Sequence, residues 1–394
     1  MTEQGRDPLA AELSRHIDGD RDAMIALLAA LVAIPSENPP ARVCLPCVDL
    51  LAGAIASLGL ECRRIDIPSP ADAPRAAIQA SSGPPGATLY FHGHYDVVPA
   101  SVPGQFDPRV EGDALFGRGS SDMKSGLVAM IYAAKAVAAA GVTRRARIGL
   151  TIVPDEETGG AFGSAALDGM GELAADAVGM LLPEPTSGVV WNANRGAISL
   201  EVTVKGRAAH VGLAHLGVNA FEGAVAIVNR LLALKARVHP SILLVGGRVE
   251  AGSNFNVVPD TCRFTIDRRI DPGEDLSVEK RRLMDLLDEA RADGIDLDTR
   301  VLQEGRASAS PLHSPLGEAL AQSIAEVTGR PAVFEMCPGL LETRFYAQRG
   351  VPAFAYGPGI LAVSHGPKEY VRISRMIETA KVYALTAAQV LASL

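Results

Sequence analysis

The sequence predicts an α/β fold in which a mostly parallel sheet carries helices on both faces, with a smaller α+β domain inserted into the chain. Three apolar runs, 87–91, 147–153 and 177–182, each end abruptly at histidine or carboxylate residues. Helical or long connections separate these runs, which is the βαβ pattern of a parallel sheet. After about Asn194 the pattern changes to closely spaced strands and helices, and βα alternation resumes from His313.

Length and composition predict two domains and argue against several classes of partner. The 394 residues exceed the usual size of one hydrophobic core, and 48% of them are apolar. The net charge of −8 argues against binding to nucleic acid or to an anionic membrane. Residues 1–20 lack the apolar core of a signal peptide, and no apolar stretch is long enough to span a bilayer. We therefore expect a cytoplasmic protein that contacts neither nucleic acid nor membrane.

The five cysteines are irregularly spaced, so the sequence predicts no disulfide framework. Cys44 and Cys47 form a CxxC pair, but no second pair is present to complete a zinc site. The residues around them have a helical pattern, and we interpret both as semi-buried thiols on a helix.

The first part of the chain alternates helices and strands. Residues 21–33 and 43–58 have helical periodicity, and the first of these helices ends before a proline, where the backbone leaves the α region. A turn cluster precedes the strand 87–91, and a long loop rich in Pro, Gly and Asp follows it. An alanine-rich helix is predicted over 124–140, before the second and third apolar strands.

The inserted domain is predicted over residues 195–306, so residues 1–194 and 307–394 form the larger domain. The larger domain closes with a helix, a short strand and a final helix, predicted over 316–327, 352–356 and 372–391. The predicted elements of the insert are strands over 197–204, 241–249, 261–270 and 295–302, and helices over 217–238 and 276–291.

Metal-ligand side chains follow the three predicted strands. His94 comes after the first strand, Glu156 and Glu157 after the second, and Glu184 after the third. Because the carboxyl ends of parallel strands meet at one edge of a sheet, we expect these side chains to lie close together. Imidazole and carboxylate ligands together suit zinc, cobalt or manganese.

Two more such residues, Asp122 and His365, lie in predicted loops. A carboxylate that bridges two ions would give a pair of metals that activates a shared water. Taken singly, each candidate has an ordinary interpretation: His92 is a histidine near a strand end, and Asp96 is a turn residue. Taken together, three strand ends with ligand chemistry make a metal site the stronger interpretation.

The motifs around these residues resemble those of the di-zinc amidohydrolases, the metallopeptidase family of aminoacylase, acetylornithine deacetylase, succinyl-diaminopimelate desuccinylase and glutamate carboxypeptidase. The resemblance extends from residues 34–36 to residues 369–371, and it implies the same two-domain fold. The matching motifs are His94-Tyr95-Asp96-Val97-Val98-Pro99, Gly117-Arg118-Gly119, Asp122-Met123-Lys124, Asp155-Glu156-Glu157, Pro183-Glu184-Pro185 and His365-Gly366-Pro367.

The resemblance implies a role for each ligand-type residue. His94, Asp122 and Glu184 would bind one ion. Asp122, Glu157 and His365 would bind the other, so that Asp122 bridges. The implied cofactors are two divalent ions, Zn²⁺ first, with Co²⁺ or Mn²⁺ as alternatives.

Two further roles follow from the same resemblance. Glu156 would be the general base, which takes a proton from water and passes it to the leaving nitrogen. Asp96 would orient His94 by accepting the N–H of its other ring nitrogen. The peptide between Asp122 and Met123 is expected to be cis.

The insert also resembles the family. His210 matches a histidine that reaches across a dimer and stabilises the oxyanion, so a homodimer through the insert is implied. Asn256 and Arg269 match the part that binds the substrate carboxylate, with Arg268 as a near alternative. A guanidinium suits this task because its planar fork binds a carboxylate bidentately.

Gly339 matches a late substrate-binding glycine, but the residues after it depart from the family pattern. That pattern is usually glycine, a hydroxyl residue and aspartate, followed by arginine and phenylalanine; here residues 339–345 are GLLETRF. The lost hydroxyl and the longer acid leave the acyl group and the amino acid open.

We therefore expect a metal-dependent hydrolase that cleaves the amide bond of an N-acyl amino acid, with a dipeptidase or carboxypeptidase as the alternative. A (β/α)₈ amidohydrolase that uses His92 and His94 as an HxH motif would need further strand-end histidines. A serine acyl-enzyme that uses Ser121 to Lys124 as SxxK lacks its partner motifs. A non-catalytic binding protein on this fold remains a more remote alternative.

Overall fold

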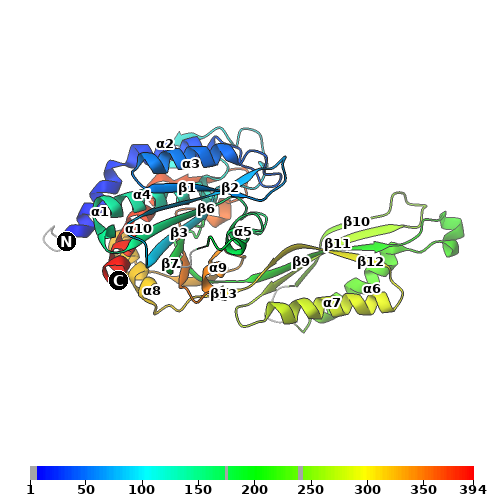
Figure 1. Cartoon of the computed structure of the whole chain (residues 1–394). Helices are drawn as coiled ribbons and strands as arrows, with labels where there is room; N and C mark the ends of the chain where they lie inside the picture. Colours follow the sequence, from blue (N-terminus) through cyan, green and yellow to red (C-terminus); the bar gives the residue numbers. More distant parts are fainter. Residues whose placement is uncertain (1–6, 174–175, 238–242) are drawn as a thin grey trace. The chain divides into compact units, whose positions relative to one another are not determined.

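The computed structural model describes residues 7–173, 176–237 and 243–394 (Figure 1). The chain divides into two compact units. The first comprises Met1–Asn192, Ala309–Met336 and Glu342–Leu394, and the second comprises Ala193–Ser308 and Cys337–Leu341. Parts of the predicted helix 217–238 and strand 241–249 lie outside the described residues.

A large mixed sheet forms the centre of the first unit. Its middle strands β6 (Arg147–Val153), β3 (Thr88–His94) and β7 (Ala177–Leu182) are parallel neighbours, and β15 (Ala353–Ala355) continues this parallel set. Antiparallel pairing occurs toward the edges, so the predicted α/β class is confirmed. The other strands are β1 (Glu61–Ile67), β2 (Arg75–Ser82), β8 (Val190–Asn194), β13 (Ser308–Ala309) and β14 (Phe334–Cys337).

Helices cover both faces of this sheet, as predicted. Side chains alternate along β3, so Phe91 and His92 point to opposite faces. Phe91 stacks on Tyr383 of α10, with ring centroids 4.8 Å apart, whereas His92 contacts Tyr346 of α9. The helices of this unit are α1 (Pro8–Gly19), α2 (Arg21–Val32), α3 (Leu45–Ser57), α4 (Ser125–Ala139), α5 (Ser164–Gly169), α8 (Pro315–Thr328), α9 (Thr343–Ala347) and α10 (Ile373–Ala392).

The long loop after β3 supplies two strands of a small second sheet. Strands β4 (Arg109–Glu111) and β5 (Ala114–Phe116) form a hairpin, and β16 (Tyr370–Arg372) pairs with β5. This pairing joins the segment that precedes Asp122 to the segment that follows His365.

The second unit is a four-stranded antiparallel sheet in the order β10-β11-β9-β12. Alternate residues of β11, from Cys262 to Ile270, are buried against the helix layer. The strands are β9 (Gly196–Lys205), β10 (Leu243–Ala251), β11 (Thr261–Ile270) and β12 (Leu297–Gly305), and the helices are α6 (Ala220–Lys235) and α7 (Leu276–Ala292).

The structure also contains elements that the sequence patterns did not predict. Helix α1 and the strands β1 and β2 are the largest of these. Strand β1 is mostly exposed and carries four charged residues in seven, so it has no clear apolar alternation. Cys44 and Cys47 are fully buried rather than semi-buried. Among the described helices, none combines the length and the apolar character that crossing a bilayer requires.

Candidate metal centre

The predicted strand-end residues lie together in the first unit. His94 of β3 is opposite Val153 of β6, and Phe91 of β3 is opposite Leu181 of β7. The three strands therefore end at the same edge of the sheet. This register brings the residues after β6 and β7 to the side of His94.

Asp122 lies between the two imidazoles. Its Oδ1 is 3.4 Å from Nε2 of His94, and its Oδ2 is 3.3 Å from Nε2 of His365. On the His94 side, Oε1 of Glu184 is 3.8 Å from Nε2 of His94. On the His365 side, Oε2 of Glu157 is 3.2 Å from Nε2 of His365. The peptide that follows Asp122 is cis, as expected. One carboxylate thus faces two separate groups of ligand-type side chains.

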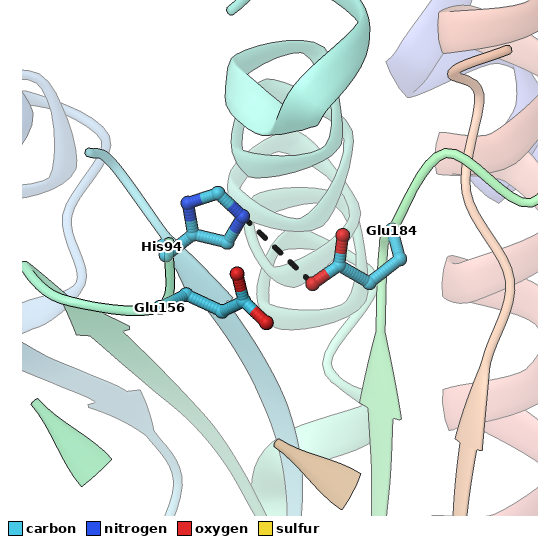
Figure 2. Close-up of side chains that lie close together, drawn as sticks. All are labelled: His94, Glu156 and Glu184. Atoms are coloured by element: carbon cyan, nitrogen blue, oxygen red, sulfur yellow. Dashed lines mark ion pairs between the residues drawn. The ribbon is translucent and has the colours of Figure 1, made fainter. Parts of the chain in front are cut away.

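Glu156 also reaches this place. Figure 2 shows the carboxylate of Glu156 beside the imidazole of His94 and the carboxylate of Glu184. Ligand atoms of these three residues lie within 4.8 Å of one another, and so do those of His94, Asp122 and Glu157. Proximity alone leaves Glu156 as either a ligand or a base.

Unpartnered polar atoms indicate what the site can hold. Nε2 of His94, Oε1 of Glu157 and Oε1 of Glu184 are buried without a hydrogen-bond partner of good geometry. Buried polar atoms in proteins are normally paired, and these three belong to residues of one cluster. A donor set of imidazole nitrogens and carboxylate oxygens around such atoms fits a divalent metal ion.

The electrostatics of the site favour positive charge. Hydrogen bonds to Asp122 and Glu157 raise the pKa of His365 to about 10. Burial alone would lower the pKa of His94, but Asp122 and Asp96 raise it well above 6.5. Burial alone would raise the pKa of Asp122, but His365 and His94 hold it well below its usual range.

The pKa values of the other carboxylates shift in the opposite direction to that of Asp122, because burial is the largest effect there. Burial raises the pKa of Glu156, Glu157 and Glu184, because an ionised carboxylate loses its hydration in the interior. Neighbouring acids, Asp122 among them, raise these pKa values further. The cluster therefore holds more carboxylates than its two imidazoles can neutralise, and a cation would relieve that imbalance.

Asp96 supports both His94 and the loop after β6. Nδ1 of His94 is 3.0 Å from the backbone oxygen of Asp96 and 3.3 Å from its Oδ1. The two carboxylate oxygens of Asp96 accept the backbone N–H groups of Glu156 and Glu157, each at 3.2 Å. Asn38, for which no role was expected from the sequence, donates to Asp96 at 2.9 Å. The only local feature that sets Asn38 apart in the sequence is its position before two prolines, in the loop after α2.

His92, two residues before His94 on β3, pairs with a carboxylate that is far away in the sequence. Its Nε2 is 2.7 Å from Glu342, and its Nδ1 is 3.0 Å from the hydroxyl of Tyr346. Burial alone would raise the pKa of Glu342, but His92 and Arg344 lower it. The longer acid of the altered 339–345 segment therefore pairs with a histidine in the interior. The interpretation of His92 as a histidine near a strand end, with no ligand role, agrees with these contacts.

The candidates of the second unit lie at two ends of its sheet. His210 pairs with Val257 in an isolated bridge, and the backbone N–H of Val211 donates to Asn256, so His210 and Asn256 are neighbours. Asn256 precedes Thr261, the residue at which β11 begins. Arg269 lies near the other end of β11, roughly 26 Å along the strand from Thr261.

Gly339 belongs to that second end of the sheet. The N–H of Gly339 contacts the sulfur of Cys337, and the backbone oxygen of Cys337 accepts from Arg195, which directly precedes β9. The second unit thus holds its candidates as two separate pairs.

Alternation along β11 distinguishes Arg268 from Arg269. Arg268 is on the buried face, only 1% exposed, and pairs with Glu274 and Glu279. Arg269 is on the opposite face, partly exposed, and pairs with Asp267. A buried and fully paired arginine is not available to a substrate, so Arg269 is the candidate that remains.

The family is shown by comparison with known proteins. Residues 90–389 match the model of peptidase family M20/M25/M40. The chain belongs to this family. A curated relative, succinyl-diaminopimelate desuccinylase from Alkalilimnicola ehrlichii, is 28% identical over 378 residues, which cover 91% of this chain and 96% of the relative.

Solved structures share the fold of this M20 chain at low identity. The metallo-carboxypeptidase Sso-CP2 from Sulfolobus solfataricus superposes with a TM-score of 0.81 at 16% identity, covering 94% of this chain and 99% of that one. The di-peptidase Dug1p from Saccharomyces cerevisiae gives 0.79 at 15% identity, with coverage of 97% and 98%. These likenesses concern the fold.

Proposed function

We propose that the chain is a metal-dependent deacylase that hydrolyses the amide bond of an N-acyl amino acid. The observation that carries this proposal is Asp122, whose two oxygens face the imidazoles of His94 and His365 at 3.4 and 3.3 Å. We assign His94, Asp122 and Glu184 to one ion, and Asp122, Glu157 and His365 to the other. The name of the desuccinylase relative supports an N-acyl amino acid as the substrate class.

In this proposal Glu156 is the proton carrier. Two bound ions, Zn²⁺ or alternatively Co²⁺ or Mn²⁺, would lower the pKa of a shared water and polarise the amide carbonyl. Glu156 accepts the water proton and later donates it to the leaving nitrogen. Asp96 holds the His94 ring and the Glu156 backbone in place while the proton moves.

We assign substrate recognition to residues outside the metal cluster. Arg269 would bind the carboxylate that lies next to the amide, because a guanidinium pairs bidentately with a carboxylate. His210 would stabilise the oxyanion, and Asn256 and Gly339 would line the substrate path.

A dipeptidase or carboxypeptidase is the second candidate. The names of the solved structures with this fold support it, since they include a di-peptidase and a metallo-carboxypeptidase. Both candidates use the same attack on an amide next to a carboxylate, and they differ only in the group on the acyl side.

A hydrolysis screen tests the proposal. The purified protein, loaded in turn with Zn²⁺, Co²⁺ and Mn²⁺, is assayed on acetyl, succinyl, formyl, carbamoyl and aminoacyl derivatives of a panel of amino acids. We expect turnover of N-acyl amino acids that a chelator abolishes and added metal restores. Preference for aminoacyl substrates would favour the peptidase, and inactivity on all of them with both ions bound would refute the amidase.

We also propose that two copies pair through the insert. His210 and Asn256 lie at one end of the sheet and Arg269 at the other, so a second copy is needed if all three are to serve one substrate. Exposed apolar side chains on and before α6 and on β10 support such a contact. They are Val211, Leu213, Leu216, Val218, Phe221, Val225, Leu232, Leu244 and Val249.

We further propose that the protein is located in the cytoplasm.

Phe221→Glu is expected to convert the dimer into a monomer. Phe221 is 47% exposed on the outer face of α6, one turn before Val225, and a charge there would be desolvated in the interface. Light scattering coupled to size-exclusion chromatography measures the mass against 41.2 kDa per chain. Val278→Glu, on the exposed face of α7, is the control and is expected to remain dimeric. A dimeric Phe221→Glu variant would exclude this face.

A further inference from the structure

We propose that the buried ion pair of Arg118 and Glu369 is the positioning device that sets the spacing of the metal ligands, and above all the place of His365. This inference rests on the proposed metal centre. The hydrogen bonds of this pair go to backbone groups and not to the ligand-type side chains. Both act on the backbone of the segments that carry those side chains.

His365 needs support from outside its own side chain. The side chain is 52% exposed, so packing does not fix it. Its φ of +64° is in the left-handed region, which is uncommon for a residue other than glycine. The imidazole contacts Asp122 and Glu157, and the contacts of the loop backbone determine whether the ring can reach them.

Glu369 acts on the Asp122 segment. Its Oε1 accepts the backbone N–H groups of Ser121 and Asp122, both at 3.0 Å, and its Oε2 is 2.5 Å from Nη1 of Arg118. Its own backbone oxygen accepts from Gly117 at 3.0 Å, next to the pairing of β5 with β16. The carboxylate of Glu369 thus fixes the backbone from which the bridging carboxylate extends.

Arg118 connects this segment to two others. Its Nη2 donates to the backbone oxygen of His365 at 3.2 Å and to that of Pro99 at 3.4 Å. Pro99 ends the motif that begins at His94. One guanidinium therefore joins the segments of His94, Asp122 and His365.

Gln105 provides a second connection to the same loop. Its side-chain amide donates to the backbone oxygen of Gly366 at 3.0 Å, and its side-chain oxygen accepts from the N–H groups of Ser101 and Val102. Gln105 also accepts the backbone N–H of Arg118 through its own backbone oxygen, at 2.7 Å. Arg118 thus holds the carbonyl group of His365, and Gln105 holds that of Gly366.

Burial makes this pair different from a surface salt bridge. Arg118 is 1% exposed and the side chain of Glu369 is fully buried, so water cannot replace a lost partner. Each pair member contributes a distinct contact. Glu369 acts on the backbone of Asp122, which would serve both ions. Nη2 of Arg118 acts on the backbone of His365 itself, which would serve one ion, whereas its longer contact of 3.4 Å is with Pro99, at the far end of the His94 motif.

Two conservative variants separate these contributions. Glu369→Gln keeps the shape but presents an amide NH₂ either to Arg118 or to the backbone N–H groups, and we expect both ions to bind about 10–100-fold more weakly. Arg118→Lys keeps a charge for Glu369 but has no second nitrogen for His365. We expect it to weaken one ion by a similar factor and to leave the other near its wild-type affinity.

Matched controls come from the second unit. Arg268 and Glu279 form another buried arginine–carboxylate pair, so Arg268→Lys and Glu279→Gln impose the same chemical changes within the second unit. Thermal unfolding of all four metal-free variants measures the general cost of disturbing a buried pair. We expect similar losses of stability in both pairs, with metal affinity changed only in the first.

The experiment is a stepwise titration of the full-length metal-free protein with Co²⁺, followed by calorimetry and by the absorption spectrum of bound cobalt. Two unchanged affinities in Glu369→Gln would overturn the inference, and equal weakening of both ions in Arg118→Lys would overturn the distinct role of Arg118. A wild-type protein that binds no Co²⁺ or Zn²⁺ would instead refute the metal centre itself. The two failures are therefore distinguishable.

Discussion

Glu156→Gln is expected to retain two metal ions and to lower kcat by about 10²–10⁴-fold, which is the usual contribution of a general base. Glutamine has the shape of glutamate but cannot accept the water proton. In this variant His94 still faces the carboxylate of Asp122, and Glu184 still faces the imidazole of His94. Metal analysis of the purified variant and its steady-state kinetics measure the two properties separately.

The adjacent residue provides the contrast. Glu157→Gln removes the carboxylate that lies 3.2 Å from His365, so we expect it to lose metal as well as turnover. Glu156 lies close enough to His94 and Glu184 to be a ligand itself. If Glu156→Gln lost an ion, or if it kept near-normal kcat, the assignment of the base would be wrong.

Asp122→Asn is expected to abolish tight binding of both ions. The two oxygens of Asp122 face two different imidazoles, and an amide offers only one oxygen while it turns an NH₂ group toward the other side. The charge of the bridging carboxylate is lost at the same time. Metal analysis after gel filtration is expected to give well under one ion per chain, where the wild type gives two.

His365→Ala is the comparison for that result. It removes a ligand on one side of Asp122 only, so one ion is expected to stay bound. If Asp122→Asn kept both ions, Asp122 would not bridge, and the two groups of ligands would be independent sites.

The sequence alone predicted that the side chains after three strand ends lie close together, and the structure places them so. His94, Glu156, Glu157 and Glu184 each come a few residues after the end of an apolar run, and the parallel register of β6, β3 and β7 brings them together. The runs 147–153, 177–182 and 261–270 coincide with strands β6, β7 and β11. A buried strand is recognisable because its apolar character is local, and the edge of a parallel sheet collects whatever follows it.

Long-range pairs left no such local signal. His92 and Glu342 are 250 residues apart, and nothing near either residue indicates that they form a buried pair. Arg118 and Glu369 are similarly far apart in the sequence, and the pairing of β5 with β16 brings their segments together. Strands β1 and β2 were missed because an exposed, charged edge strand and an alanine-rich strand have weak β propensity. Tertiary contact decides these features, and a single sequence does not encode it in any local window.

The contacts of Asp96 have a mechanical consequence for the proposed chemistry. Its carboxylate accepts the N–H groups of two consecutive residues, Glu156 and Glu157, one on each oxygen. The backbone positions of the proposed proton acceptor and of a proposed metal ligand therefore depend on the same side chain. A displacement of Asp96 would therefore shift the backbone of both residues together with the His94 ring, which the same carboxylate contacts.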